Sequence, residues 1–125
     1  MSNLKVLIKK LSPATRIALE KSANYCINQL NYEIEIEHIL VELINQEEKN
    51  DLHILLKNNN ILSDELIDDL KESISQLPKG NNRTPIFSKS IIRLLEQSWL
   101  LASADNNPVI RSSHLLIALL TAPDL

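Results

Sequence analysis

The segment from Leu77 to Ser103, LPKGNNRTPIFSKSIIRLLEQSWLLAS, decides how the two halves of this chain are joined. Its first part has loop chemistry, because it holds the only glycine of the chain and an Arg-Thr-Pro run. Its second part has apolar residues at helical spacing, and Ser88 before them is a suitable N-cap. The segment therefore predicts a linker that ends on the apolar pair Ile86 and Phe87, followed directly by a helix.

Composition favours one all-α domain. A chain of 125 residues suffices for a single hydrophobic core but not for two. Hydrophobic residues make up 44% of the chain and aromatic residues only 3%, so the core must be aliphatic. One glycine and five prolines fit helices better than a turn-rich β fold.

Charge and cysteine content exclude several classes of protein. The net charge is −3, and we find no cluster of lysine and arginine along the chain, so a nucleic-acid surface is not expected. Cys26 is the only cysteine, which excludes an internal disulfide and favours a reducing compartment. We find neither an apolar run long enough for a membrane span nor a signal peptide. We therefore expect a cytoplasmic domain that does not contact the membrane.

Apolar periodicity predicts a succession of short helices. The interval 31–37 alternates apolar and acidic residues, which also suits a strand; we predict an extended connector, because no nearby segment offers a strand partner. The predicted helices cover residues 3–11, 13–29, 38–45, 52–57, 63–77, 89–103 and 114–120.

The two halves of the chain are related by an internal repeat. His38 and His114 lie 76 positions apart (114 − 38 = 76). The same offset, without gaps, relates several Ser, Glu, Leu and Ile residues. We expect two helix–connector–helix units related by a pseudo-twofold axis, packed face to face. The predicted organisation is an extra helix (1–11), a first repeat (12–77), a linker (78–87) and an incomplete second repeat (88–125), with the chain ending inside, or just short of, the natural end of the domain.

This organisation resembles the double-repeat N-terminal domain of Clp/Hsp100 AAA+ ATPases. The segments that carry the resemblance are ALEKSANYC (18–26), EHIL (37–40), LPKGNNRTPIFS (77–88) and IRSSHLLIALL (110–120). The LPKGNNRTPIFS run and the extra first helix are similar to the ClpV (TssH) branch of type VI secretion. The resemblance covers nearly the whole chain.

The resemblance implies a function. The full protein would be a homohexameric ATPase that disassembles contracted secretion sheaths in the bacterial cytoplasm. Its N-terminal domain, monomeric when isolated, would capture the N-terminal helix of the larger sheath subunit (VipB, also called TssC) in a hydrophobic groove. The alternative is the N-domain of a general unfoldase or disaggregase that binds adaptors or unfolded chains. A purely structural helical bundle is a further alternative.

No segment carries a catalytic motif. One glycine cannot supply a phosphate-binding Gly-x-x-x-x-Gly-Lys-Ser/Thr loop, so we expect no cofactor here and place ATP and magnesium elsewhere in the full-length protein. We expect no metal site, because a metal needs three or four ligands at suitable spacing. His38 and His114 are interpreted as structural residues at two equivalent helix starts. Cys26 lies on a predicted buried stripe and should be inert.

The first helix and the end of the linker are the candidate binding surface. One face of the helix is apolar, and the linker ends on three apolar residues. We predict that these two sets form the walls of a groove for an amphipathic helix. Because both sets lie outside the repeat, the fold should tolerate Leu7→Asp and Phe87→Ala. Docking of the first helix on the core, or on a membrane surface, is the alternative. The predicted contact residues are Leu4, Leu7, Ile8, Leu11, Pro85, Ile86 and Phe87.

Overall fold

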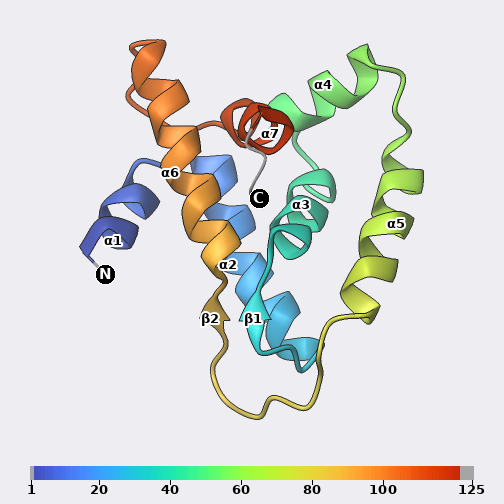
Figure 1. The fold of residues 1–125 in the computed structure, drawn as a ribbon. Helices are drawn as coiled ribbons and strands as arrows, with labels where there is room; N and C mark the ends of the chain where they lie inside the picture. The colour runs from blue at the N-terminus through green and yellow to red at the C-terminus, as the bar shows by residue number, and fades with distance from the viewer. Residues whose placement is uncertain (1, 122–125) are drawn as a thin grey trace.

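The computed structural model describes residues 2–121, and seven helices and two short strands account for most of them (Figure 1). The predicted all-α class is confirmed. Residues 122–125 of the predicted second repeat lie outside the described residues. The helices are α1 (Ser2–Lys9), α2 (Pro13–Asn28), α3 (Ile36–Ile44), α4 (Asp51–Asn58), α5 (Ser63–Ser75), α6 (Lys89–Ala104) and α7 (Ser112–Thr121), and the strands are β1 (Glu33–Ile34) and β2 (Ile86–Phe87).

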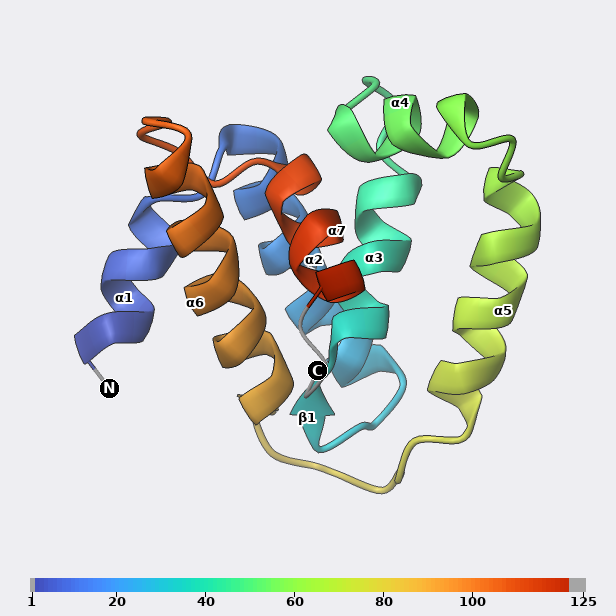
Figure 2. The same ribbon diagram turned by 45° about the horizontal axis from the view of Figure 1, so that its top comes forward.

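The helices form a row with α1 and α5 at its two ends. Figure 2 shows α1, α6, α7, α3 and α5 in that order across the molecule, with α2 behind α7 and α4 along the top. The largest helix–helix contacts join α2 to α3, α6 to α7 and α3 to α5. The hydrophobic core fills the space among α2, α3, α6 and α7, and consists mainly of buried leucine and isoleucine.

The internal repeat is visible in the hydrogen bonds at the start of each unit. The backbone N–H of Ser12 donates to the carbonyl of Ile110 at 2.8 Å, and the equivalent N–H of Ser88 donates to Ile34 at 3.0 Å. Both serines also act as N-caps, because each hydroxyl accepts from the backbone N–H three residues later. Each unit therefore begins against the connector of the other, as the predicted pseudo-twofold arrangement requires.

The ends of α2 and α6 repeat the same geometry. Leu30 and Asn106, equivalent under the 76-residue offset, have φ values of 58° and 56°. A left-handed residue directly after a helix lets the following N–H groups satisfy the last free carbonyls. For Leu30 this conformation is strained, because its Cβ comes too close to the following carbonyl oxygen, a contact that glycine avoids by having no Cβ. The sequence places a leucine there, and the fold nonetheless imposes the same turn as at Asn106.

The connector prediction for residues 31–37 is wrong in one respect, because β1 does have a strand partner. It pairs in parallel with β2, with Glu33 opposite Ile86 and Ile34 opposite Phe87. The partner was missed because it lies in the linker, far along the sequence. The equivalent contact in the other half is a parallel bridge between Leu11 and Ile110.

Helix α4 is held against α7 by polar contacts. The Arg111 guanidinium donates two hydrogen bonds of 2.6 Å to the Asp51 carboxylate. This contact lowers the pKa of Asp51, assisted by the Ser113 hydroxyl. Asn50 is the N-cap of α4, because its side chain accepts from the N–H groups of Leu52 and His53. Asp51 is the first helical residue, so the helix begins one position earlier than the predicted start at residue 52.

Candidate functional site

Helix α1 is docked on the body of the domain by the apolar face that was predicted to line a groove. Leu7 is 6% exposed and Leu11 is 2% exposed, and both belong to the core cluster. Leu4 and Ile8 are half-buried and pack against the same cluster. The Arg16 guanidinium donates to the Lys9 carbonyl at 3.0 Å and so holds the end of the helix. The expectation that the fold tolerates Leu7→Asp is wrong, because this position is in the core.

The linker residues differ among themselves in exposure. Pro85 is buried, Ile86 is 65% exposed, and Phe87 is half-buried against the core. Successive residues of a strand point to opposite sides, so Ile86 faces outward while Phe87 faces inward. Pro85, predicted as part of a groove wall, is buried and offers little surface to a ligand.

The predicted contact residues fall into two groups. The buried residues hold α1 and β2 in place, whereas the residues with accessible surface can contact a ligand directly. Ile86 alone is fully on the surface. The supporting residues are Leu7, Leu11 and Pro85; the accessible ones are Leu4, Ile8, Ile86 and Phe87.

An apolar hollow of about 480 Å³ lies between α1 and α6, and sequence analysis missed most of it. Val6 is 53% exposed and Leu100 is 61% exposed. Trp99 is half-buried at this surface, with the Lys10 ammonium 5.0 Å from its ring centroid. The signal in the sequence was Val6, an apolar residue off the buried stripe of α1. The lining residues are Val6, Leu7, Glu96, Gln97, Trp99 and Leu100.

All three histidines are structural, and each has the same role at a helix start. The Nδ1 atoms of His38, His53 and His114 accept the backbone N–H of the residue three positions earlier, at 2.9 Å, 3.0 Å and 2.9 Å. His38 and His114 were predicted as such a pair, and that interpretation is confirmed. Among the described residues, we find no group of three or more His, Cys, Asp or Glu side chains arranged to hold a metal ion.

Cys26 is buried between α2 and β1. Its Sγ lies 3.3 Å from the Glu33 carbonyl, and the side chain is 0% exposed. Burial, and secondarily the charge of Glu35, raises the pKa of the thiol to about 11. At that pKa roughly one thiol in a thousand is ionised at mildly alkaline pH.

We expect Cys26 to be unreactive in the native protein and to react fully once the chain is unfolded. The measurement is the absorbance change with a disulfide thiol reagent, in buffer and in strong denaturant. Rapid stoichiometric modification without denaturant would show that the thiol is accessible.

Comparison with known proteins shows which family this fold belongs to. The Clp repeat (R) N-terminal domain family matches residues 10–124. Chaperone protein ClpB of Yersinia enterocolitica is 31% identical over 122 residues, which are 97% of this chain but only 14% of ClpB. The chain thus spans about a seventh of that relative.

Solved structures share the fold over almost the full chain. The N-terminal domain (1–163) of the ClpV1 ATPase from the E. coli EAEC Sci1 type VI secretion system has a TM-score of 0.92 and 32% identity, covering 99% of this chain and 76% of that one. A ClpV N-domain in complex with a VipB peptide has a TM-score of 0.82 and 31% identity, covering 97% of this chain and 74% of that one. No helix within residues 2–121 is long and apolar enough to cross a membrane. With its double repeat and a family match over nearly every residue, this chain belongs to the Clp repeat N-terminal domain family and is similar to the N-domains of type VI secretion ClpV ATPases.

Proposed function

We propose that this chain is the N-terminal protein-binding domain of a type VI secretion AAA+ ATPase and that it binds the N-terminal helix of the larger sheath subunit, VipB/TssC. The observation that carries the proposal is an apolar surface beside the docked helix α1, in a fold that a ClpV N-domain uses in complex with a VipB peptide. Helix-in-groove recognition needs such a surface, because the ligand buries one apolar stripe.

The proposed site comprises α1, β2 and the adjoining side of α6. Leu4, Ile8, Ile86 and Phe87 offer accessible apolar surface, and the hollow at Val6 adjoins them on α1. The buried residues Leu7, Leu11 and Pro85 act indirectly, by fixing α1 and β2 in place.

The remaining activities belong to the longer protein. We propose that it is a cytoplasmic homohexamer whose ATP and magnesium sites lie outside this domain, and that it disassembles contracted sheaths for reuse. The domain itself is non-catalytic and, in isolation, monomeric. A family match to a protein-interaction domain supports the non-catalytic assignment.

A general unfoldase N-domain is the second candidate, and the identity to ClpB favours it. In that case the partners are adaptors or unfolded chains rather than one sheath helix. Binding of isolated sheath subunits by a tagged domain, in competition with an unfolded model protein, separates the two functions. Preference for the unfolded protein would support the ClpB-like function.

We expect a synthetic peptide of the sheath subunit's N-terminal helix to bind the domain, and Phe87→Ala to weaken that binding by about 2 kcal/mol, roughly thirtyfold in Kd. The physical reason is loss of an aromatic surface at the centre of the site. The measurement is calorimetric titration below the melting temperature, because Phe87 also packs on the core.

Ile54→Ala is the matched control for this titration. Ile54 is 54% exposed on α4, away from α1 and β2 (Figure 1), and its truncation should change the peptide affinity less than about twofold. Wild-type affinity in a Phe87→Ala domain with native circular dichroism would place the peptide elsewhere on the surface.

A further inference from the structure

Charged side chains are segregated in the folded domain, although the net charge is only −3. The stretches that bring α1 and α6 together, residues 1–16 and 83–100, contain seven cationic side chains and one acidic one. Helix α5, at the opposite end of the row of helices (Figure 2), contains five acidic side chains and one lysine. These cations are spread over two separate stretches of the chain, and the fold brings the helices that carry most of them side by side. We name the seven cations the basic face: Lys5, Lys9, Lys10, Arg16, Arg83, Lys89 and Arg93.

Within the basic face, the cations of α1 and α6 lie on the two helices that border the apolar hollow. Lys5 and Lys9 are exposed on α1, and Lys10 covers the Trp99 ring. On α6, Lys89 and Arg93 are exposed one turn apart and continue toward Leu100, which lines the hollow.

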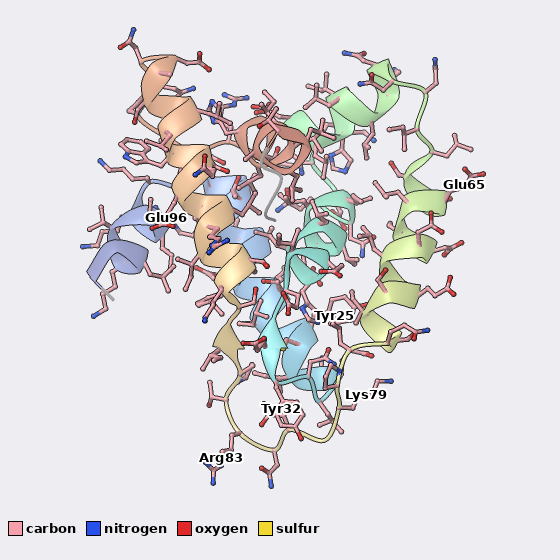
Figure 3. The ribbon with its side chains drawn as sticks, viewed as in Figure 1. Tyr25, Tyr32, Glu65, Lys79, Arg83 and Glu96 are labelled. Carbon is pink, nitrogen blue, oxygen red and sulfur yellow. The ribbon has the colours of Figure 1, made fainter. Side chains whose placement is uncertain are left out.

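Figure 3 labels two charged residues of these stretches, Arg83 and Glu96. Arg83 lies at the bottom of the linker loop, and Glu96, the single acid of these stretches, lies between α1 and α6. Glu96 is part of the hollow's lining. The one charged residue of the hollow's lining is therefore an acid, and the cations of α1 and α6 lie outside the lining on the two helices that border it.

We propose that this face selects amphipathic helices whose polar flanks are acidic. The inference rests on the proposed function, since it specifies the chemistry of the helix bound at that site. An apolar stripe would cover Val6 and Leu100, while carboxylates beside it would meet the lysines and arginines on both sides. Complementary charge speeds association and discriminates against partners of the same sign. A helix with basic flanks would meet repulsion from both α1 and α6.

The apolar lining favours a peptide over the other anionic partners. A nucleic-acid backbone would meet the cations but leave Val6 and Leu100 uncovered, and such surfaces rely on phosphate contacts. A second copy of this chain, presenting its acidic helix α5, is the remaining source of complementary charge.

The first test uses two designed peptides with identical apolar stripes, one with glutamate and one with lysine at every flanking position. At about 0.1 M salt the glutamate peptide is expected to bind about tenfold more tightly or better, measured by fluorescence anisotropy. Raising the salt to about 0.5 M shortens the range of the charges and should reduce that preference to less than about threefold. Equal affinities at low salt would overturn the proposal.

The second test reverses charges on the protein. Lys5→Glu combined with Lys9→Glu is expected to weaken the glutamate peptide about tenfold, because both positions flank the hollow. Lys49→Glu combined with Lys57→Glu makes the same change beside α4 and should alter affinity less than about twofold. Both lysine pairs are exposed, so circular dichroism should show native folds. Equal loss in the two double variants would overturn the placement.

Further experiments distinguish the other possible occupants, and they separate failure of this inference from failure of the proposed function. A duplex oligonucleotide that displaces the glutamate peptide at equal or lower concentration would assign the face to nucleic acid. Dimers at low salt that the same peptide dissociates would assign it to a second copy. If the sheath peptide binds without salt dependence, the charge inference fails while the proposed function stands. If only the glutamate peptide binds, the inference stands and the sheath assignment fails.

Discussion

Leu7→Asp is expected to detach α1 from the domain, whereas the same substitution at the adjacent Val6 is expected to leave the fold intact. The Leu7 side chain is 6% exposed and the Val6 side chain is 53% exposed. A carboxylate at Leu7 would be buried without a partner, and the core would also lose the leucine contacts. The expected cost is about 3 kcal/mol or more.

Trp99 reports directly on this detachment. It is the only tryptophan, and it lies on α6 beneath Lys10 and next to α1. We expect its fluorescence to shift to longer wavelength in Leu7→Asp, together with a lower midpoint of chemical unfolding. Val6→Asp should keep the native emission and change the free energy of unfolding by less than about 0.5 kcal/mol. Native emission and unchanged unfolding in Leu7→Asp would mean that α1 is not docked as described.

This pair of substitutions shows how far the sequence was informative about α1. The stripe of Leu4, Leu7, Ile8 and Leu11 correctly predicted an amphipathic helix. An apolar stripe indicates that the helix packs against another apolar surface, but it does not identify that surface. Here the stripe packs against the protein's own core. The residues left on the surface, Val6 among them, lie off the stripe, so periodicity alone does not point to them.

The repeat made most of the remaining fold predictable. Equal spacing of Ser12 with Ser88 and of His38 with His114 predicted two equivalent units, and their caps and connectors are indeed equivalent. The pairing of β1 with β2 escaped prediction because parallel strands are joined by distant segments, and each strand is only two residues long. Charge segregation also depends on which helices become neighbours, so a net charge of −3 gave no indication of a basic face.

The histidine caps could have been found from spacing. Each histidine is the third residue after a helix N-cap or its equivalent, in Glu-x-x-His, Asn-x-x-His and Arg-x-x-His. A capping box normally has Glu or Gln there, whose side chain accepts the N-cap N–H. A neutral imidazole does the same through Nδ1, as it does at His53, which sequence analysis did not single out.

Acidification is expected to destabilise the domain through His38. Its Nδ1 accepts the Glu35 N–H at 2.9 Å, so the proton is on Nε2, which donates to Asn31 Oδ1 at 3.0 Å. Protonation of Nδ1 would remove the acceptor and bury a charge at the positive end of α3. Burial lowers the pKa of His38 to about 4.

The direction of the pH dependence follows from this lowered pKa. The unfolded chain, with a histidine pKa near 6.5, binds the proton more readily than the folded chain does. The stabilisation is therefore complete above about pH 6.5 and falls as the pH drops toward 4, by roughly 3 kcal/mol in total. Glu35 and Glu42 oppose this trend, because burial raises their pKa values and the folded state gains their protons first.

His38→Gln isolates the histidine contribution from these carboxylates. A glutamine can accept the Glu35 N–H as in an ordinary capping box, but it does not titrate. Urea unfolding of both proteins from pH 7 to pH 4 gives the difference directly, since the contributions of Glu35 and Glu42 are common to both. We expect the wild type to lose about 2 to 3 kcal/mol more than the variant over this interval. Parallel curves would mean that His38 is protonated equally in the folded and unfolded states, and that the buried Nδ1 cap does not control the acid stability of the domain.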